Sequence, residues 1–205
     1  MTETMTLSGS RPAPVADISD AALMARLAGG DSSALGALYQ RYARMVGSLL
    51  LRLDSDRGPA AADDLVQEVF LTLLETAPRY REQGRLRSWI CGIAVRKSRS
   101  TRRTLWRRRL LGARSPGTAA AGVAGPPSSF DGRVEAHDRV SRALDRLRPG
   151  AREALILIAV EGFSAAQAGE VLGISEGAAA VRVHRARAAM VAALADLDRK
   201  PEETR

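Results

Sequence analysis

The stretch 161–190 constrains the fold most, because it has the pattern of two short helices joined by a tight turn. Ser164 can cap the first helix, and Gln167 three residues later completes a capping box. Gly173 follows that helix at a point where a positive φ is often needed, and Ser175 can cap the second helix. The pattern predicts a helix-turn-helix.

The second of these helices has two chemically different faces. At about 100° per residue, a narrow apolar seam forms on one side from Ala179, Val183, Ala186 and Met190. The opposite face carries Ala178, Val181, His184, Arg185 and Ala188, and the flanks carry Arg182 and Arg187. An Arg-rich helix is more often only a solvated face, but the capped partner helix favours a DNA-reading helix in the major groove.

Composition narrows the classes of partner. The net charge of +8 at pH 7 favours a polyanion, and nucleic acid before membrane. A single cysteine, Cys91, excludes an intrachain disulfide and a Cys-rich metal site. The sequence has no apolar run of about 18 residues and no signal-peptide pattern, so we expect a cytoplasmic protein without membrane insertion.

Helical periodicity and breaks predict an all-α chain of two small domains joined by a flexible linker. The expected division is a disordered tail at 1–15, a helical domain at 16–110, a Pro/Gly/Ala-rich linker at 111–133 and a second helical domain at 134–199.

The third predicted helix, from Pro59 to about Thr76, carries a compact acidic-polar patch of Asp63, Asp64, Gln67 and Glu68. The patch is either a solvated face, whose carboxylates interact favourably with the N-terminus of the helix, or a docking surface for a basic partner.

The fourth predicted helix begins near Arg85 and runs into the stretch 96–109, which is rich in basic residues and has no acidic one. A charge run is often a solubilising face or a disordered arm, but this run continues a patterned helix, which favours a surface that follows phosphates. Trp106 within it could either pack or stack.

Two blocks of sequence, at a characteristic separation, resemble a known family. The first is Asp-Asp-Leu-Val-Gln-Glu-Val-Phe at 63–70, followed by a Leu-Arg-Ser-Trp-Ile helix. The second is the helix-turn-helix with Leu-Gly-Ile-Ser at 172–175 and His-Arg-Ala-Arg at 184–187. Together they closely resemble the extracytoplasmic function (ECF) sigma factors, the smallest members of the sigma-70 family.

This resemblance implies two helical domains, called region 2 and region 4, that bind core RNA polymerase and have no catalytic residues, metal or cofactor. Region 2 would dock on the clamp of the beta-prime subunit and melt the −10 promoter element. Region 4 would read the −35 element of promoter DNA and sit on the flap of the beta subunit. Family members can also have an anti-sigma factor as partner, and no small-molecule substrate is expected.

Carried onto this chain, the resemblance assigns three sets of residues. The polymerase-binding set is Asp63, Asp64, Gln67 and Glu68. The set for the −10 element and its backbone is Arg79, Tyr80, Arg85, Arg87, Arg96, Lys97 and Arg99. The set for the −35 element is Ser175, Ala178, Val181, Arg182, His184, Arg185 and Arg187.

The chain departs from the family in its predicted reading helix. The family usually has Thr-Val-Lys-Ser where this chain has Ala-Ala-Ala-Val at 178–181. Base reading then depends on His184 and Arg185, with Ala178 and Val181 limited to apolar contacts such as thymine methyls. Ala and Gly at 168–169 replace larger residues, so we expect a looser domain.

Two other classes of function were weighed. An autonomous helix-turn-helix regulator shares the C-terminal pattern but does not explain the acidic patch followed by a basic helix. An enzyme is disfavoured because His137 and His184 are too few for a His-rich site, and adjacent Asp63 and Asp64 point about 100° apart on a helix.

Overall fold

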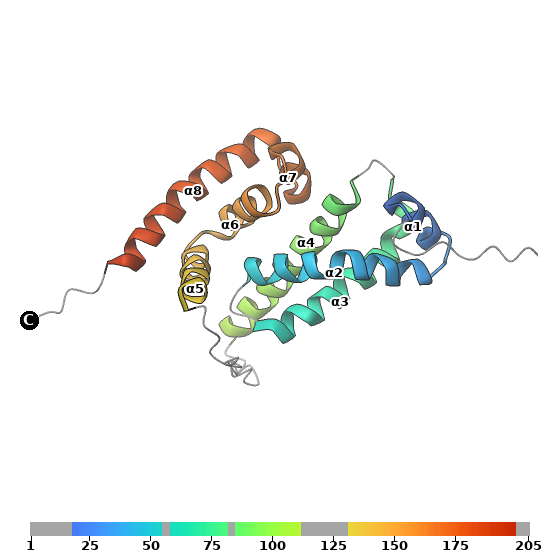
Figure 1. The fold of residues 1–205 in the computed structure, drawn as a ribbon, viewed down its shortest axis with the longest axis horizontal. Coiled ribbons are helices and arrows are strands. Elements are labelled where there is room, and N and C mark those ends of the chain that lie inside the picture. Colours follow the sequence, from blue (N-terminus) through green and yellow to red (C-terminus); the bar gives the residue numbers. More distant parts are fainter. Residues whose placement is uncertain (1–17, 55–57, 82–84, 112–130, 200–205) are drawn as a thin grey trace, which may run out of the picture.

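The computed structural model describes residues 18–54, 58–81, 85–111 and 131–199, without the side chains of 109 and 131–137, and within these ranges every regular element is helical (Figure 1). The N-terminal half consists of α1 (Asp20–Ala28), α2 (Ser33–Leu53), α3 (Gly58–Thr76), the 3-10 turn η3 (Ala77–Arg79) and α4 (Leu86–Leu110). The C-terminal half consists of α5 (Asp131–Asp145), α6 (Pro149–Leu155), the turn η4 (Ile156–Val160), α7 (Ala165–Leu172) and α8 (Glu176–Asp198).

The first two helices begin where side chains can satisfy free backbone N–H groups. The Ser19 hydroxyl accepts from the Ala22 N–H at 3.2 Å, so Ser19 is the cap of α1. Ser32 stands at the N-cap of α2 without a capping bond from its side chain. The Asp31 carboxylate instead accepts from the Ser33 N–H at 3.0 Å.

The N-terminal half packs α2, α3 and α4 side by side, and α1 covers one end of α2 (Figure 1). The apolar face of α3 packs into the core, since Leu65, Val69 and Leu73 are buried. Trp89 is half-buried and meets the Tyr80 ring edge-on, with the ring centroids 5.7 Å apart. Among the described helices, none is long and apolar enough to span a bilayer.

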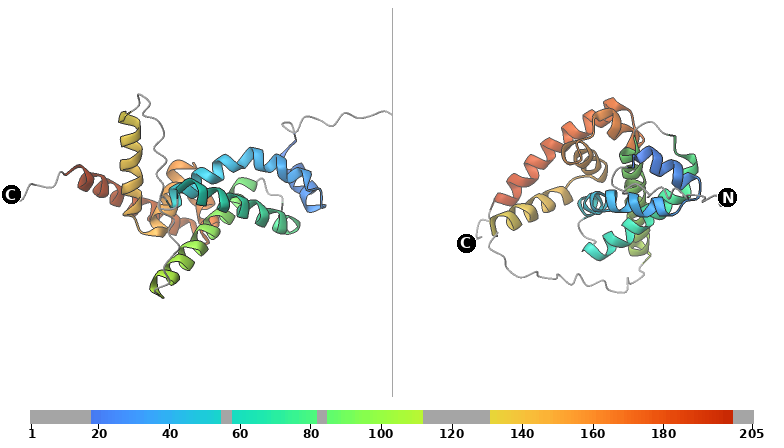
Figure 2. Two further views of the ribbon diagram at one scale, coloured as in Figure 1. Left: turned by 90° about the horizontal axis from the view of Figure 1, so that it is seen from below. Right: turned by 45° about the vertical axis from the view of Figure 1, so that its right-hand side comes forward.

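In the C-terminal half, α8 forms a long diagonal against which α5, α6 and α7 all pack (Figure 2). The helix α5 begins at Asp131, earlier than the predicted domain start at 134. The predicted linker at 111–133 and the predicted tail at 1–15 lie almost wholly outside the described residues.

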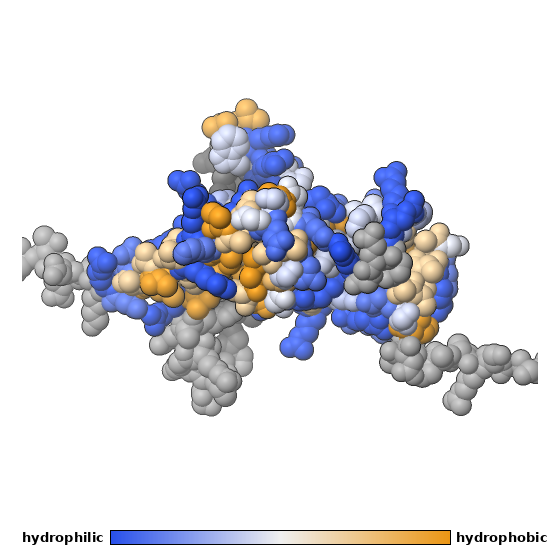
Figure 3. Space-filling view, turned by 90° about the horizontal axis from the view of Figure 1, so that it is seen from above, coloured by the Kyte–Doolittle hydropathy of each residue, from blue (hydrophilic) through white to orange (hydrophobic). Residues whose placement is uncertain are grey.

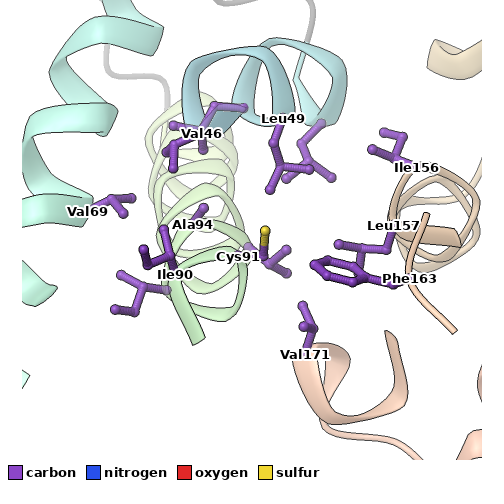
Figure 4. Packing of buried hydrophobic residues seen from close by; sticks show 14 of the residues in the cluster. Val46, Leu49, Val69, Ile90, Cys91, Ala94, Ile156, Leu157, Phe163 and Val171 are labelled. Carbon is purple, nitrogen blue, oxygen red and sulfur yellow. The ribbon is translucent and has the colours of Figure 1, made fainter. Parts of the chain in front are cut away.

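The two halves also pack against each other, because α7 lies along α4 and the η4 turn reaches α2. Their buried apolar residues form one cluster across this boundary. Figure 4 shows Cys91 of α4 between Leu49 of α2 and a group made of Leu157, Phe163 and Val171. The sequence predicted two domains but contained no sign of this shared core.

A π-helical turn separates α6 from the helix-turn-helix. The helix α6 ends at Leu155, and η4 continues it with wider winding. The Glu161 N–H donates to the Ile156 carbonyl, five residues earlier, at 2.9 Å. The Phe163 N–H donates to the Leu157 carbonyl at 3.0 Å.

The predicted helix-turn-helix is present with its caps. Ser164 and Gln167 form the reciprocal capping box of α7, and the Ser175 hydroxyl accepts from the Ala178 N–H at 3.2 Å. Gly173 has φ 71° and ψ 40°, the left-handed conformation that glycine adopts without a steric cost.

The expectation of a loose domain is wrong. Ala168 is fully buried, and a Cβ added at Gly169 would lie 2.8 Å from the carbonyl oxygen of Ile174. The small residues in α7 therefore allow that helix to approach the backbone of the turn, and a larger side chain would force the two apart.

We predict that Gly169→Ala destabilises the C-terminal half by about 1–3 kcal/mol, because the new methyl group meets backbone that cannot move aside cheaply. Gly177→Ala in α8 is the matched control, since a Cβ there has no neighbour within 4 Å, and it should stabilise by about 0.5–1 kcal/mol. Denaturant unfolding of both variants measures the difference. Equal stability would mean that the turn tolerates the methyl group.

Cys91 gives a second prediction. Its thiol is fully buried, lies 3.6 Å from the Met45 sulfur, and has a pKa raised by burial to about 12. Since the thiolate is the reactive form, a thiol reagent at mildly alkaline pH should modify the folded protein only as fast as the core around Cys91 opens, whether by unfolding or by separation of the two halves. The free energy of unfolding should be insensitive to this group below its ordinary pKa of 9.0 and should fall as pH rises toward 12. Rapid labelling of the folded chain would contradict this burial.

Candidate nucleic-acid and polymerase interface

The exposure of α8 follows the two predicted faces. Ala179, Val183 and Ala186 are buried against the rest of the C-terminal half, and Met190 is half-buried, which confirms the apolar seam. The opposite face is open to solvent. It presents Val181, His184, Arg185 and Ala188, with Ala178 half-buried beside them and Ser175 exposed at the helix cap.

The two flanking arginines of α8 have different surroundings. Arg182 is half-buried, and its guanidinium Nη1 lies 3.3 Å from where a Cβ of Gly150 would be. Arg182 and Arg185 line one hollow together with Arg146 and Arg148, which precede α6. Arg187 is exposed on the other side, next to an apolar groove that α8 forms with Ile158.

Sequence reasoning missed Arg146 and Arg148 as members of this cluster. Their signal was present as a basic pair just before Pro149, in a position that the sequence showed only as a helix break. Four guanidinium groups line one hollow beside the exposed face of α8, and together they could hold an anionic group such as a phosphate.

A second hollow lies at the start of α4. Its walls from the N-terminal half are Arg79, Tyr80, Arg81, Arg85, Ser88, Trp89, Gly92 and Arg96. A Cβ at Gly92 would lie 3.2 Å from the Arg96 guanidinium, so the missing side chain leaves room for that group. Arginines around an aromatic pair provide charge for a backbone and a surface on which a base can stack.

The remaining wall of this hollow comes from the C-terminal half. Glu170 and Val171 of α7 line it, and the Glu170 carboxylate forms an ion pair with Arg85. Arg85 is therefore already occupied by an anionic group of the same chain.

Arg87 is occupied in a similar way. Its guanidinium lies 4.6 Å from the centre of the Phe163 ring and 2.9 Å from a carboxylate oxygen of Glu161. The same carboxylate meets Arg52 of α2 at 3.3 Å, and its side chain is only 7% exposed.

Further along α4, Arg99 makes a two-pronged contact with Glu153 of α6, with a closest N–O distance of 2.6 Å. The hydrogen bonds to Glu153 raise the pKa of Arg99, which stays charged. Arg102 meets the other oxygen of Glu153 at 3.4 Å. The Glu153 side chain is 3% exposed, and its carboxylate pairs with both arginines. A buried carboxylate needs such partners.

Arg152, next to Glu153, joins the halves through backbone carbonyls. Its guanidinium donates to Leu144 at 2.7 Å and, across the boundary, to Leu53 at 3.2 Å, while also contacting Asp145. Leu53 is the last residue of α2, so Arg152 satisfies a carbonyl that the helix itself leaves free. In the sequence, the only signal for this role was the charged pair of Arg152 and Glu153 inside an otherwise apolar helix.

The acidic-polar patch on α3 is exposed at all four predicted residues, Asp63, Asp64, Gln67 and Glu68. Glu68 contacts Lys97 of α4 at 3.3 Å. The structure therefore brings together one residue predicted for polymerase binding and one predicted for DNA binding.

The projecting end of α4 is basic and carries apolar side chains that do not enter the core. Trp106 is 64% exposed, which excludes the packing alternative for this residue in the structure. Figure 3 shows hydrophilic residues over much of the surface, with apolar residues gathered between them on the left part of this face. Among the side chains that the structure describes, no three His, Cys, Asp or Glu residues are grouped to hold a metal ion.

Comparison with known families agrees with this division into halves. Residues 38–108 match Sigma-70 region 2, which covers most of α2, α3 and α4. Residues 137–190 match Sigma-70 region 4, which covers the helix-turn-helix and the helices before it.

Several characterised proteins are similar over most of their length. The chain is 33% identical to the RNA polymerase sigma factor CarQ of Myxococcus xanthus over 162 residues, which is 79% of this chain and 90% of CarQ. It is 32% identical to the ECF RNA polymerase sigma factor SigM of Mycobacterium tuberculosis over 180 residues, 88% of this chain and 87% of SigM.

Solved structures show the same likeness. CnrH in complex with the cytosolic domain of CnrY superposes with a TM-score of 0.62 at 27% identity, covering 86% of this chain and 97% of that one. The sigma factor RpoE of Bartonella quintana, in complex with the anti-sigma factor NepR, gives 0.61 at 26% identity, covering 78% and 96%. The chain therefore belongs to the ECF sigma factors of the sigma-70 family, proteins that bind core RNA polymerase for transcription initiation and are not enzymes.

Proposed function

We propose that this sigma factor reads the −35 element with α8, holds the melted −10 strand with the start of α4, and docks on the polymerase clamp with the acidic-polar patch of α3. The observation that carries the proposal is the capped helix-turn-helix whose seam is buried and whose opposite face leaves Arg185 exposed. We place this activity in the cytoplasm. An anti-sigma factor is a proposed regulator, because the two solved relatives described above are complexes and one of the partners is an anti-sigma factor.

The proposed reading face divides its side chains between bases and phosphates. Arg185 is exposed at the middle of the open face, where a guanidinium reaches O6 and N7 of guanine. Arg182, held over Gly150, lies at the edge with Arg146 and Arg148 and suits phosphates. Val181 is 49% exposed and offers an apolar contact to a thymine methyl.

The proposed strand face combines the hollow at the start of α4 with the basic side chains that follow it. Tyr80 and Trp89 provide aromatic surface, and Arg79 and Arg96 are exposed cations beside it. Lys97 and Arg99 extend the positive charge along the helix. This combination suits an unpaired base and the backbone that follows it.

The proposed reading role of Arg185 predicts a change in specificity. Arg185→Ala should cost about 1–3 kcal/mol and relax the preference at one base pair of the −35 element. Arg182→Ala is the matched control and should weaken all sequences alike. The measurement is transcription by core polymerase with each protein from a saturated library of upstream elements. Unchanged preferences with Arg185→Ala would assign Arg185 to positioning, and binding of duplex promoter without core would favour an autonomous regulator.

The proposed docking role of α3 predicts loss of core binding. Asp64→Lys with Glu68→Lys should lower the affinity for core polymerase by about tenfold or more, since attraction becomes repulsion on an exposed patch. Asp196→Lys with Asp198→Lys makes the same change in net charge on exposed residues of α8 and is the control. Circular dichroism checks that helicity is kept. Co-purification with core at the wild-type level would exclude this patch from the interface.

A further inference from the structure

Three carboxylates of the C-terminal half lie on arginines of the N-terminal half. Glu153 of α6 holds Arg99 and Arg102, Glu161 after η4 holds Arg52 and Arg87, and Glu170 of α7 holds Arg85. All of these pairs cross the boundary between residues 18–111 and residues 131–199.

The arginines in these pairs overlap with those proposed for DNA. Arg85, Arg87 and Arg99 belong to the set expected for the −10 element, and each is paired with a carboxylate from the other half. A carboxylate presents two oxygens to a guanidinium much as a phosphate does, so the two anions compete for the same donors.

The same contact supplies one wall of the hollow at the start of α4. Glu170 and Val171 stand on one side of it, facing the arginines and the Tyr80–Trp89 pair. Val171 is also buried, together with Phe163, in the core that contains Cys91 (Figure 4). A DNA strand that bound Arg85 would have to displace the Glu170 carboxylate of α7 from it.

We propose that the packed arrangement is a self-inhibited state, in which α6, η4 and α7 cover the strand-binding face of α4 and must separate from it before single-stranded DNA binds. The inference rests on the proposed function of α4. The protein is then a two-state molecule in which the covering half and a DNA strand are mutually exclusive partners of the same arginines.

The ion pairs join the two halves but leave a route to opening. Glu153 and Glu161 are nearly inaccessible, so their charges are stable only while paired or after the halves separate into water. Their arginine partners keep between about a quarter and two fifths of their side-chain surface exposed, so a competing anion can reach them. Neutralising the carboxylates removes the attraction while the arginines stay in place.

The test compares two triple variants of the full chain. Glu153→Gln, Glu161→Gln and Glu170→Gln remove the carboxylates at the boundary. Glu176→Gln, Asp196→Asn and Asp198→Asn remove the same number of charges from α8, away from the boundary. The readouts are the radius of gyration by small-angle X-ray scattering and the affinity for a fluorescein-labelled single-stranded DNA oligonucleotide.

We expect a larger radius of gyration for the boundary variant than for wild type and control. We also expect it to bind the oligonucleotide about tenfold more tightly than the control variant. A binding-competent state populated at about one tenth lowers the apparent affinity by that factor, and removal of the closed state restores it. An unchanged radius, or an affinity gain equal to that of the control, would overturn the inference.

Glu170→Lys keeps the inference testable if the triple boundary variant does not fold. Glu170 is 48% exposed, so the change adds no burial cost, yet it places a cation against Arg85. It should raise the affinity for the oligonucleotide about twofold or more above that of Glu176→Lys, which makes the same change in charge on exposed α8. No gain in this variant would also count against self-inhibition.

Arg96→Ala with Lys97→Ala separates failure of this inference from failure of the proposed function. Neither residue pairs with the C-terminal half in the contacts described, so the radius of gyration should stay at the wild-type value. Affinity for the oligonucleotide should fall. If this double variant binds the oligonucleotide as well as wild type, the proposed strand-binding role of α4 is wrong. The radius of gyration of the boundary variant separately decides whether the boundary carboxylates hold the halves together.

Discussion

The burial of α4 on several sides is the constraint on which the rest of the structure depends. Ile90, Cys91, Ala94 and Val95 are inaccessible to solvent, because α2 and α3 cover one side of the helix and α7 covers another. A helix with so much apolar surface has only narrow strips left for charge. Its arginines therefore emerge along the edges, where they meet whatever lies beside the core: Glu161 and Glu170 near its start, and Glu153 further on.

Polar contacts at the edges of this core complete it. A carboxylate buried without a partner would be strongly destabilising, and in this protein Glu153 and Glu161 each meet two guanidinium groups. Arg152 performs the reverse task by donating to carbonyls at the ends of two helices. The many basic residues therefore have a structural role, because some of them pair with buried carboxylates of the same chain. This role is separate from the binding of a polyanion.

Local features of the fold could be predicted from the sequence, and contacts between distant segments could not. The caps at Ser164 and Ser175, the left-handed Gly173 and the seam through Val183 depend on residues a few positions apart, where spacing determines geometry. Arg99 and Glu153 are 54 positions apart, and Arg52 and Glu161 are 109 apart, so no periodicity connects them. The proposed DNA-binding residues were found by type and position, but their present partners depend on packing.

The π turn has a consequence for the angular phase of the chain. In an α-helix, residues eight positions apart, such as Glu153 and Glu161, point about 80° away from each other at 3.6 residues per turn. The wider winding of η4 reduces that offset, so both carboxylates face the N-terminal half. The winding of this segment therefore sets the direction in which Glu161 points. With the same number of residues, α-helical winding would rotate Glu161 and Phe163 by that offset, out of line with Arg87.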